Sequence, residues 1–430
     1  MAATLSTADE GFEAAFAAFL ETKREASQEV DDIVREIIAR VRREGDAALA
    51  GYTQRFDRFD VTAAGMRVTR AEIEAAYGAC SPETLDALRL AHERIRTHHA
   101  RQLPQDAQYT DPIGVELGWR WTAVSTVGLY VPGGMASYPS SVLMNAVPAK
   151  VAGVERVVMV VPAPDGRLNP LVLVAADIAG VDEIFRIGGA QAVAALAYGT
   201  ETVPAVDKIV GPGNAYVAAA KRQVFGRVGI DMIAGPSEVL VVADRDNDPG
   251  WIAADLLAQA EHDTAAQSIL MTEDADFAHA VVEAVERQLR QLSRADIASA
   301  SWRDFGAVIL VGSLDEAPSL IDRIAPEHLE LATVRADDLL PKIRNAGAVF
   351  LGRHTPEAIG DYVGGSNHVL PTARSARFSS GLSVLDFVKR MSTLRLGPEQ
   401  LRALGPAAIA LAAAEGLEAH GRSVSIRLNM

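Results

Sequence analysis

The chain has 430 residues, of which 49% are apolar and 23% are charged, and its formal net charge is -15. This composition is typical of a soluble protein that is long enough for two to four structural units. The negative charge repels polyanions and therefore argues against nucleic acid as a partner. Cys80 is the only cysteine, which excludes intrachain disulfides and cysteine-rich zinc sites.

The chain shows no targeting or membrane signal. Its first residues lack a basic segment and soon reach Asp9 and Glu10, so we expect no signal peptide. The apolar run 168–181 is too short to span a bilayer and contains Asp177, so we expect no membrane segment. These features predict a cytoplasmic enzyme.

The N-terminal third reads as helical. Apolar residues recur at helical spacing over residues 8–21, 28–44 and 70–101. The first of these segments is too short to hold a core alone. We therefore expect it to dock on this chain or on a partner.

From about residue 115, apolar strands alternate with helices. The expected order of the first run is strand 124–131, a helical segment, strand 157–161, helix 169–179, strand 183–187, helix 190–198, strand 208–210 and helix 214–225. A second run has strands 239–243, 268–272, 307–311 and 348–351 with helices 249–262, 275–292, 315–324 and 336–344 between them. This alternation predicts the α/β class with parallel sheets.

We divide the chain into two α/β units and two small terminal segments. Residues 130–236 form one unit, and residues 237–380 form the other, which we expect the helices of residues 26–129 to complete. Residues 1–25 form an N-terminal arm. Residues 381–430 contain an Ala-rich helix at 406–415 and alternating apolar residues at 424, 426 and 428, and they too must pack on a larger body.

Three glycine-rich loops follow strands of the first run. Gly211-Pro-Gly-Asn214 opens a helix, which presents backbone N–H groups to an anion. Residue 216 is Tyr, however, so the dinucleotide fingerprint G-x-G-x-x-G is not met. Tyr130–Gly134 and Gly188–Gln191 are placed in the same way. Together the loops favour a ligand crevice over plain turns, without deciding for a nucleotide.

Gln259 and His262 lie three residues apart at the end of helix 249–262, so they share one helix face. An imidazole and an amide oxygen on one face can form half of a metal site. The alternative is an ordinary helix end whose histidine is solvated or bonded to the last carbonyls.

Glu327 and His328 place a carboxylate beside an imidazole after a helix. Such a pair can act as two acid/base groups on neighbouring atoms. Alternatively, Glu327 is a surface residue and His328 simply begins a strand.

Other metal-type or acid/base residues also occur at element ends. Asp361 and His368 lie in a loop with paired glycines, and Glu415 and His420 lie at the end of the Ala-rich helix. Ser237 precedes a strand, where it can be a plain turn residue. Two histidines, an aspartate and an amide suit a hard-to-borderline divalent ion such as Zn²⁺.

The chain resembles the histidinol dehydrogenase family, zinc-dependent enzymes of histidine biosynthesis. The matching segments span most of the chain in the family's order: 127–134, 138–145, 208–216, 231–240, 255–264, 325–331, 360–372 and 414–420. The resemblance implies two incomplete Rossmann-like parallel-sheet domains, with residues 130–236 on the NAD side. It also implies two successive reductions of NAD⁺ as L-histidinol is oxidised, through an enzyme-held aldehyde, to L-histidine.

The resemblance also implies the residues of the site. One Zn²⁺ per subunit is held by Gln259, His262, Asp361 and His420, and it orients the substrate through its imidazole and amino nitrogens. The full set of residues matching substrate contacts is Ser237, Gln259, His262, His328, Asp361, His368, Glu415 and His420.

The catalytic and nucleotide-binding residues carry over in the same way. His328 takes the hydroxyl proton in both oxidations, and Glu327 activates the water that hydrates the aldehyde. Tyr130, Gln191 and Asn214 match the NAD contacts.

Family members are homodimers with shared active sites, so the resemblance implies that residues 381–430 dock on a partner and supply it with Glu415 and His420. Two other functions remain open at this point. One is a paralogous zinc- and NAD-dependent dehydrogenase of another small alcohol, because pocket shape is not readable from sequence. The other is a non-catalytic metal- or nucleotide-binding protein.

Overall fold

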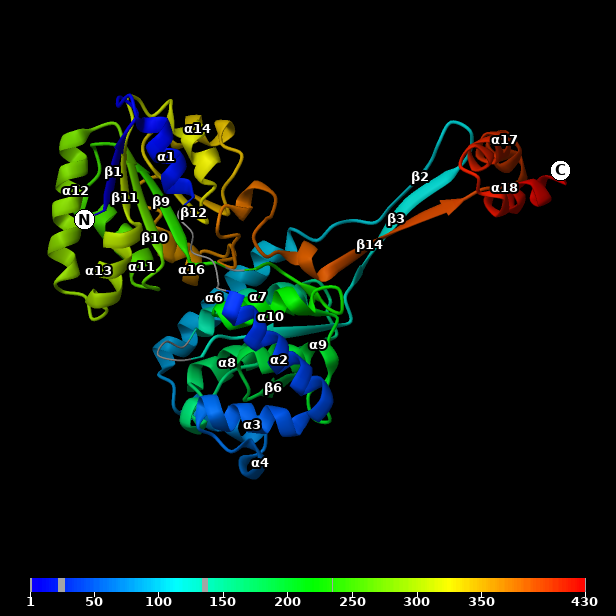
Figure 1. Ribbon diagram of the computed structural model, residues 1–430, viewed down its shortest axis with the longest axis horizontal. Helices are drawn as coiled ribbons and strands as arrows, with labels where there is room; N and C mark the ends of the chain where they lie inside the picture. The colour runs from blue at the N-terminus through cyan, green and yellow to red at the C-terminus, as the bar shows by residue number, and fades with distance from the viewer. Residues whose placement is uncertain (1, 22–27, 134–137, 234, 430) are drawn as a thin grey trace.

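The computed structural model describes residues 2–21, 28–133, 138–233 and 235–429. It contains two parallel β-sheets covered by helices and one three-stranded antiparallel sheet that projects from them (Figure 1). The expected α/β class with parallel sheets is therefore confirmed. Within these ranges, no helix is long and apolar enough to cross a membrane.

The larger sheet has six strands in the order β1-β11-β10-β9-β12-β13, and all neighbouring strands are parallel. Leu240 and Val242 of the central strand face one helical layer, whereas Val239 and Val241 face the other. This alternation follows from the two-residue period of a strand, and burial on both faces explains the continuous apolar run. The strands are β1 Ala3–Ser6, β9 Glu238–Ala243, β10 Gln267–Thr272, β11 Ala307–Leu310, β12 His328–Ala332 and β13 Ala348–Leu351.

Helices cover both faces of the six-stranded sheet. The layer on the Val239 face comprises α11 Pro249–Ala260, α12 Ala275–Leu289 and α13 Ala295–Phe305. The opposite layer comprises α1 Phe12–Leu20, α14 Ala317–Ile324 and α15 Ala336–Leu339. A further short helix, α16 Glu357–Tyr362, touches α11 and carries site residues.

The N-terminal segment docks on its own chain. Phe12 and Phe16 of α1 are buried in the core of the six-stranded sheet, and β1 pairs with β11 through Ala3 and Ala307. We expected a short helical arm that docks on this chain or on a partner, and we did not expect β1. Two phenylalanines at helical spacing identify an apolar stripe, but they do not identify the surface that buries it.

The second parallel sheet has five strands in the order β6-β5-β4-β7-β8. Its strands are β4 Thr126–Tyr130, β5 Arg156–Val160, β6 Glu183–Phe185, β7 Lys208–Val210 and β8 Gly229–Ile230. One face packs on α5 Arg70–Gly78, α6 Pro82–Ala100, α7 Pro139–Val151 and α8 Pro170–Ile178. The other face packs on α2 Gln28–Glu44, α3 Asp46–Asp57, α9 Gly189–Tyr198 and α10 Ala215–Val224.

The helices before residue 130 pack on the five-stranded sheet, although we expected them to complete the other unit. The apolar stripe of α2 (Val34, Ile37, Ile38 and Val41) is buried with residues of α9 and α10. Periodicity predicts such a stripe but does not specify its partner. The exact domain boundaries remain a prediction.

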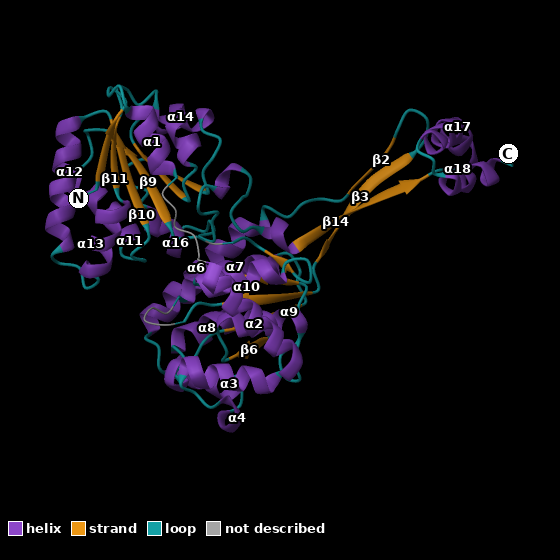
Figure 2. Cartoon of the chain, in the orientation of Figure 1, coloured by secondary structure: helices purple, strands orange, loops and turns teal. Residues whose placement is uncertain are grey.

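The three-stranded sheet forms an arm that projects from both larger sheets (Figures 1 and 2). Its order is β14-β3-β2, with β2 Ala107–Thr110, β3 Glu116–Ala123 and β14 Val388–Arg395. At the far end lie α17 Pro398–Ala414 and α18 Glu418–Ser425. The alternating apolar residues 424, 426 and 428 lie in α18 and in the 3-10 turn Ile426–Leu428 that follows it, and Val424 and Leu428 pack against Gly405 of α17.

Candidate functional site

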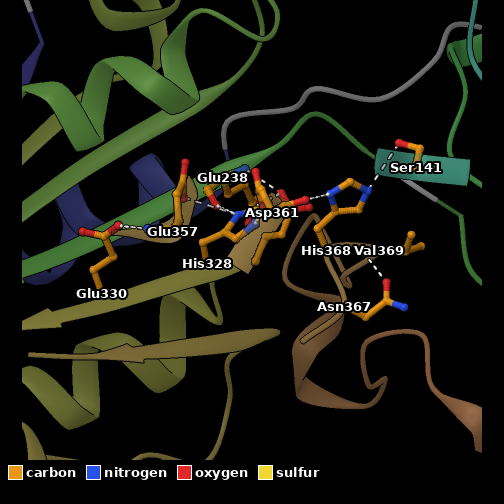
Figure 3. Close-up of polar contacts among 10 residues, drawn as sticks. Ser141, Glu238, His328, Glu330, Glu357, Asp361, Asn367, His368 and Val369 are labelled. Carbon is orange, nitrogen blue, oxygen red and sulfur yellow. Dashed lines mark hydrogen bonds and ion pairs between the residues drawn. The ribbon is translucent and has the colours of Figure 1, made fainter. Parts of the chain in front are cut away.

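The catalytic candidates lie at one edge of the six-stranded sheet, where β9 and β12 begin side by side. His328 pairs with Val239 in register, which brings Glu327 and His328 next to Glu238, while Ser237 immediately precedes β9. This is the edge at which these parallel strands start. Glu357 and Asp361 of α16 approach the same edge (Figure 3).

Glu327 is buried, and its Oε2 accepts a hydrogen bond from the Glu238 backbone N–H at 2.8 Å. Burial raises the pKa of Glu327 to about 7, despite the opposing effect of His328. A carboxyl group that titrates near neutral pH can exchange a proton with water or substrate at working pH. The geometry therefore favours an acid/base role over a surface position.

His328 is 4% exposed and its ring stacks on Phe350. Nδ1 lies 3.0 Å from the backbone oxygen of Glu238 and donates its proton there. Nε2 is buried without a hydrogen-bond partner among the described residues, and it lies 3.6 Å from Asp361 Oδ1. With Nδ1 holding a proton, Nε2 is the nitrogen that can receive one from a substrate.

Several acidic side chains surround His328. Burial lowers the pKa of His328, but the carboxylates of Glu357 and Glu327 outweigh burial and raise it well above its usual range. Oε2 of Glu357 and Oε2 of Glu327 each lie 3.7 Å from Nδ1. The edge of the sheet thus carries several acidic groups around one imidazole, a setting that attracts a cation.

Asp361 and His368 are joined directly. His368 Nδ1 lies 3.1 Å from the Asp361 backbone oxygen, and its Nε2 lies 3.3 Å from Ser141 Oγ on α7 (Figure 3). Burial lowers the pKa of His368. These two contacts of His368 connect α16, beside the six-stranded sheet, with α7, which packs on the five-stranded sheet. The site therefore lies where the two sheets meet.

Gln259 and His262 approach the same place from α11. Gln259 is 1% exposed, and its amide nitrogen has no hydrogen-bond partner within the described ranges. His262 follows the helix end and is exposed, and its backbone N–H donates to the backbone oxygen of Gln259. A buried amide without a partner is costly in an ordinary helix end, and turning this amide over would place its oxygen, a metal-type ligand, at the same position.

Glu415 and His420 lie at the far end of the arm, away from α11 and α16 (Figure 1). Both are exposed. Within the part of the chain that the structure describes, no three His, Cys, Asp or Glu side chains gather as a metal-binding group. The chain therefore does not bring these two residues to its own site.

The three glycine-rich loops converge at the carboxyl edge of the five-stranded sheet. The buried Tyr130 hydroxyl accepts a hydrogen bond from the Gly189 N–H at 3.0 Å. A Cβ on Gly211 would collide with the backbone oxygen of Tyr130. Gln191 is buried in α9, whereas Asn214 is exposed and its Oδ1 caps α10. Gly134, the last residue of the first loop, lies outside the described residues.

The sequence reading missed several residues that contact the predicted ones. Ser141, Glu238 and Glu357 contact predicted residues directly, and Glu330 bonds Glu357 in turn. Two had a readable signal. Glu330 lies two residues after His328 on a strand and so shares its face, and Glu357 lies one helical turn before Asp361.

Comparison with known proteins identifies the family. A model of the family described as histidinol dehydrogenase matches residues 20–428. The chain belongs to the histidinol dehydrogenase family. Histidinol dehydrogenase of Mesorhizobium japonicum is 72% identical and that of Brucella suis is 71% identical, each over 430 residues and the full length of both chains.

A solved structure of a histidinol dehydrogenase, from Elizabethkingia anophelis, has the same fold. Its TM-score with this chain is 0.95 at 36% identity, and the match covers 100% of this chain and 98% of the other. The resemblance inferred from sequence segments is therefore confirmed along nearly the whole chain. These matches cover nearly the whole chain, so the similarity to the family extends over the projecting arm.

Proposed function

We propose that this chain oxidises L-histidinol to L-histidine with two molecules of NAD⁺, through L-histidinaldehyde. The observation that carries the proposal is the arrangement of His328, whose Nδ1 proton is fixed on a backbone carbonyl and whose buried Nε2 faces Asp361. A base held in this tautomer, within a family of histidinol dehydrogenases, is suited to receive the proton of an alcohol.

The two catalytic residues have separate tasks in this proposal. In the first oxidation, His328 Nε2 accepts the hydroxyl proton while the carbon-bound hydrogen leaves as hydride. Glu327 then accepts a proton from the water that adds to the aldehyde, consistent with its pKa of about 7. His328 accepts the hydroxyl proton of the hydrate in the second oxidation. NAD⁺ supplies the hydride acceptor in both.

The donor set fits a zinc ion. Asp361 Oδ1 is a buried carboxylate oxygen without a hydrogen-bond partner among the described residues, the buried Gln259 of α11 carries an amide oxygen, and His262 lies two residues past the end of α11. These three residues would hold Zn²⁺ with His420 of a second copy. A zinc ion held by these residues would supply a positive charge that orients the substrate. Its charge would also oppose the acidic groups that raise the pKa of His328.

The remaining substrate contacts follow from the same placement. Ser237 precedes β9, and His368 bridges Asp361 and Ser141 beside His328. We assign the NAD side to residues 130–236, where the loops of Tyr130, Gln191 and Asn214 meet. Since the Tyr130 hydroxyl and the Asn214 side chain already bond backbone groups, these two residues also shape the loops.

We further propose a homodimer in which each arm completes the site of the other subunit. The arm leaves Leu394, Leu411 and Ile426 exposed at 66%, 65% and 60%, which is unfavourable for large apolar side chains at one end of a chain. A partner that covers them would receive Glu415 and His420 at the same time. Cytoplasmic location is part of this proposal.

The direct test is an NADH assay with histidinol and with other small alcohols on the zinc-loaded protein. We expect two NADH per histidinol consumed, and histidine as the product. Turnover of another alcohol but not of histidinol would instead identify a paralogous dehydrogenase. Zinc binding without any NADH would indicate a binding protein, and either outcome would refute the proposal.

A further inference from the structure

Three carboxyl groups lie beneath the catalytic edge, on the side of β12 that faces α11. Glu330 and Glu357 are each 2% exposed, and Asp255 is half-buried on α11. Neither Glu330 nor Asp255 belongs to the proposed metal, substrate or proton-transfer groups. Buried carboxyl groups are rare unless they are paired, so this cluster of three carboxyl groups requires an explanation.

Glu330 connects the three elements that carry the site. Its Oε1 accepts the backbone N–H of Glu357, the first residue of α16, at 2.6 Å (Figure 3). Its carboxyl group also shares a hydrogen bond with Asp255. Glu330 itself lies on β12. One side chain therefore links β12, α16 and α11.

Each of these elements carries a functional residue at a fixed spacing from the link. His328 lies two residues before Glu330 on the same strand face. Asp361 lies four residues after Glu357, and Gln259 lies four residues after Asp255, so each is one helical turn away. The far end of Glu357 returns to the site, where its Oε2 lies 3.7 Å from His328 Nδ1.

We infer that Glu330 is a positioning residue, which clamps α16 and α11 to β12 and so sets the spacing of Asp361 and Gln259 around His328. The inference rests on the proposed function, because it takes Asp361 and Gln259 as metal ligands. Residues that orient ligands in this indirect way typically change metal affinity or activity by about 10–100-fold when removed.

The protonation of Glu330 makes the inference testable. Burial and the nearby Asp255 raise the pKa of Glu330 well above its usual range, which favours a protonated Glu330 carboxyl group as the donor of the hydrogen bond to Asp255. An amide can replace both of its bonds, with the oxygen accepting the Glu357 N–H and the nitrogen donating to Asp255. Leucine has a similar size but replaces neither.

The experiment compares Glu330→Gln, Glu330→Leu and wild type by zinc affinity, from competition with a chelating dye, and by kcat and KM for histidinol. We expect Glu330→Gln to stay within about threefold of wild type. Glu330→Leu should weaken zinc binding by about 10–100-fold and lower kcat at saturating zinc. In Glu330→Leu we expect α16 and α11 to shift relative to β12, which displaces Asp361 and Gln259 from His328. We therefore expect kcat to fall by a larger factor than KM rises.

Two further variants distinguish loss of the clamp from loss of folding. Asp255→Ala removes only the α11 bond of a half-buried residue, and it should weaken zinc binding in the same direction as Glu330→Leu. Asp244→Ala is the matched control, because Asp244 is a buried carboxylate that accepts two backbone N–H groups at the opposite end of the same sheet. It should lower the melting temperature and leave zinc affinity unchanged.

The outcomes separate this inference from the proposed function. Wild-type zinc affinity in Glu330→Leu and Asp255→Ala would overturn the clamp, as would a loss in Glu330→Gln equal to that in Glu330→Leu. The absence of histidinol turnover in wild type would refute the proposed function instead. The zinc measurement still decides on the clamp in that case, since it needs no turnover.

Discussion

At the scale of single residues, the backbone carbonyl of Glu238 determines which nitrogen of His328 is available. The carbonyl binds Nδ1, so Nε2 is the base in the proposed mechanism. We expect His328→Gln to lower kcat by about 10²–10⁴-fold, because the proton acceptor is lost. Steady-state NADH formation measures this change, and metal analysis should show unchanged zinc content. Wild-type kcat in the variant would contradict the assignment.

Glu327 is assigned to the hydration step rather than to hydride transfer. Glu327→Gln keeps a group that can accept the Glu238 N–H but loses the titrating carboxyl. We therefore expect a burst of about one NADH per site followed by slow turnover, because the aldehyde forms and then waits for hydration. Rapid-mixing absorbance measures the burst. If the first NADH is as slow as the second, Glu327 acts earlier than we propose.

The sequence alone selects candidate acid/base residues, whose roles remain predictions, but it does not reveal the residues that hold them in place. Glu327, His328 and Asp361 are polar residues at element ends, which a sequence reading can select. Glu330 lies inside a strand that otherwise reads as apolar, and its role depends on Glu357 and Asp255, which are distant in sequence. Such partners are known only once the fold is known.

At the scale of elements, the loop after β7 depends on Gly211. Its φ is +110°, and a Cβ there would collide with the backbone oxygen of Tyr130. We expect Gly211→Ala to displace the loop, destabilise the protein by a few kcal/mol and raise the KM for NAD⁺ more than that for histidinol. Gly226→Ala, also at positive φ but with open space around it, is the control. Equal KM changes for NAD⁺ in both variants would contradict a nucleotide role for this loop.

The docking of α1 gives a second prediction at this scale. Phe16 is fully buried against the six-stranded sheet, far along the chain from its neighbours. Phe16→Ala should reduce the free energy of unfolding by about 3–5 kcal/mol through cavity formation. Denaturant unfolding measures the loss. A change below about 1 kcal/mol would show that the helix does not dock on this core in solution.

At the element scale, the sequence predicts whether a segment is a helix or a strand better than it predicts which element the segment packs on. Strands such as β9 and β10 and helices such as α11 were expected within a few residues, because their apolar periodicity is strong. The arm strands β3 and β14 were missed, since β3 is only partly buried and β14 is almost wholly exposed. A strand that leaves the core has no buried face, and therefore no clear period to read.

At the scale of the whole molecule, the arm separates the proposed site residues into two groups. Gln259, His262 and Asp361 lie beside the six-stranded sheet, whereas Glu415 and His420 lie beyond the three-stranded sheet (Figure 1). The length of the arm was not readable from sequence. That residues 381–430 dock on another body remains a prediction, made because the segment is too small to form a core.

The central claim is that two copies build each site together, and mixed dimers test it most directly. His262→Asn and His420→Asn variants, each inactive as homodimers, are unfolded and refolded as a mixture. A mixed dimer then has one site with both substitutions and one site with neither. We predict that the mixture regains about a quarter of wild-type histidinol turnover, because half the dimers carry one intact site, whereas the same treatment of each variant alone regains none. A mixture as inactive as its components, with mixed dimers present, would contradict the account.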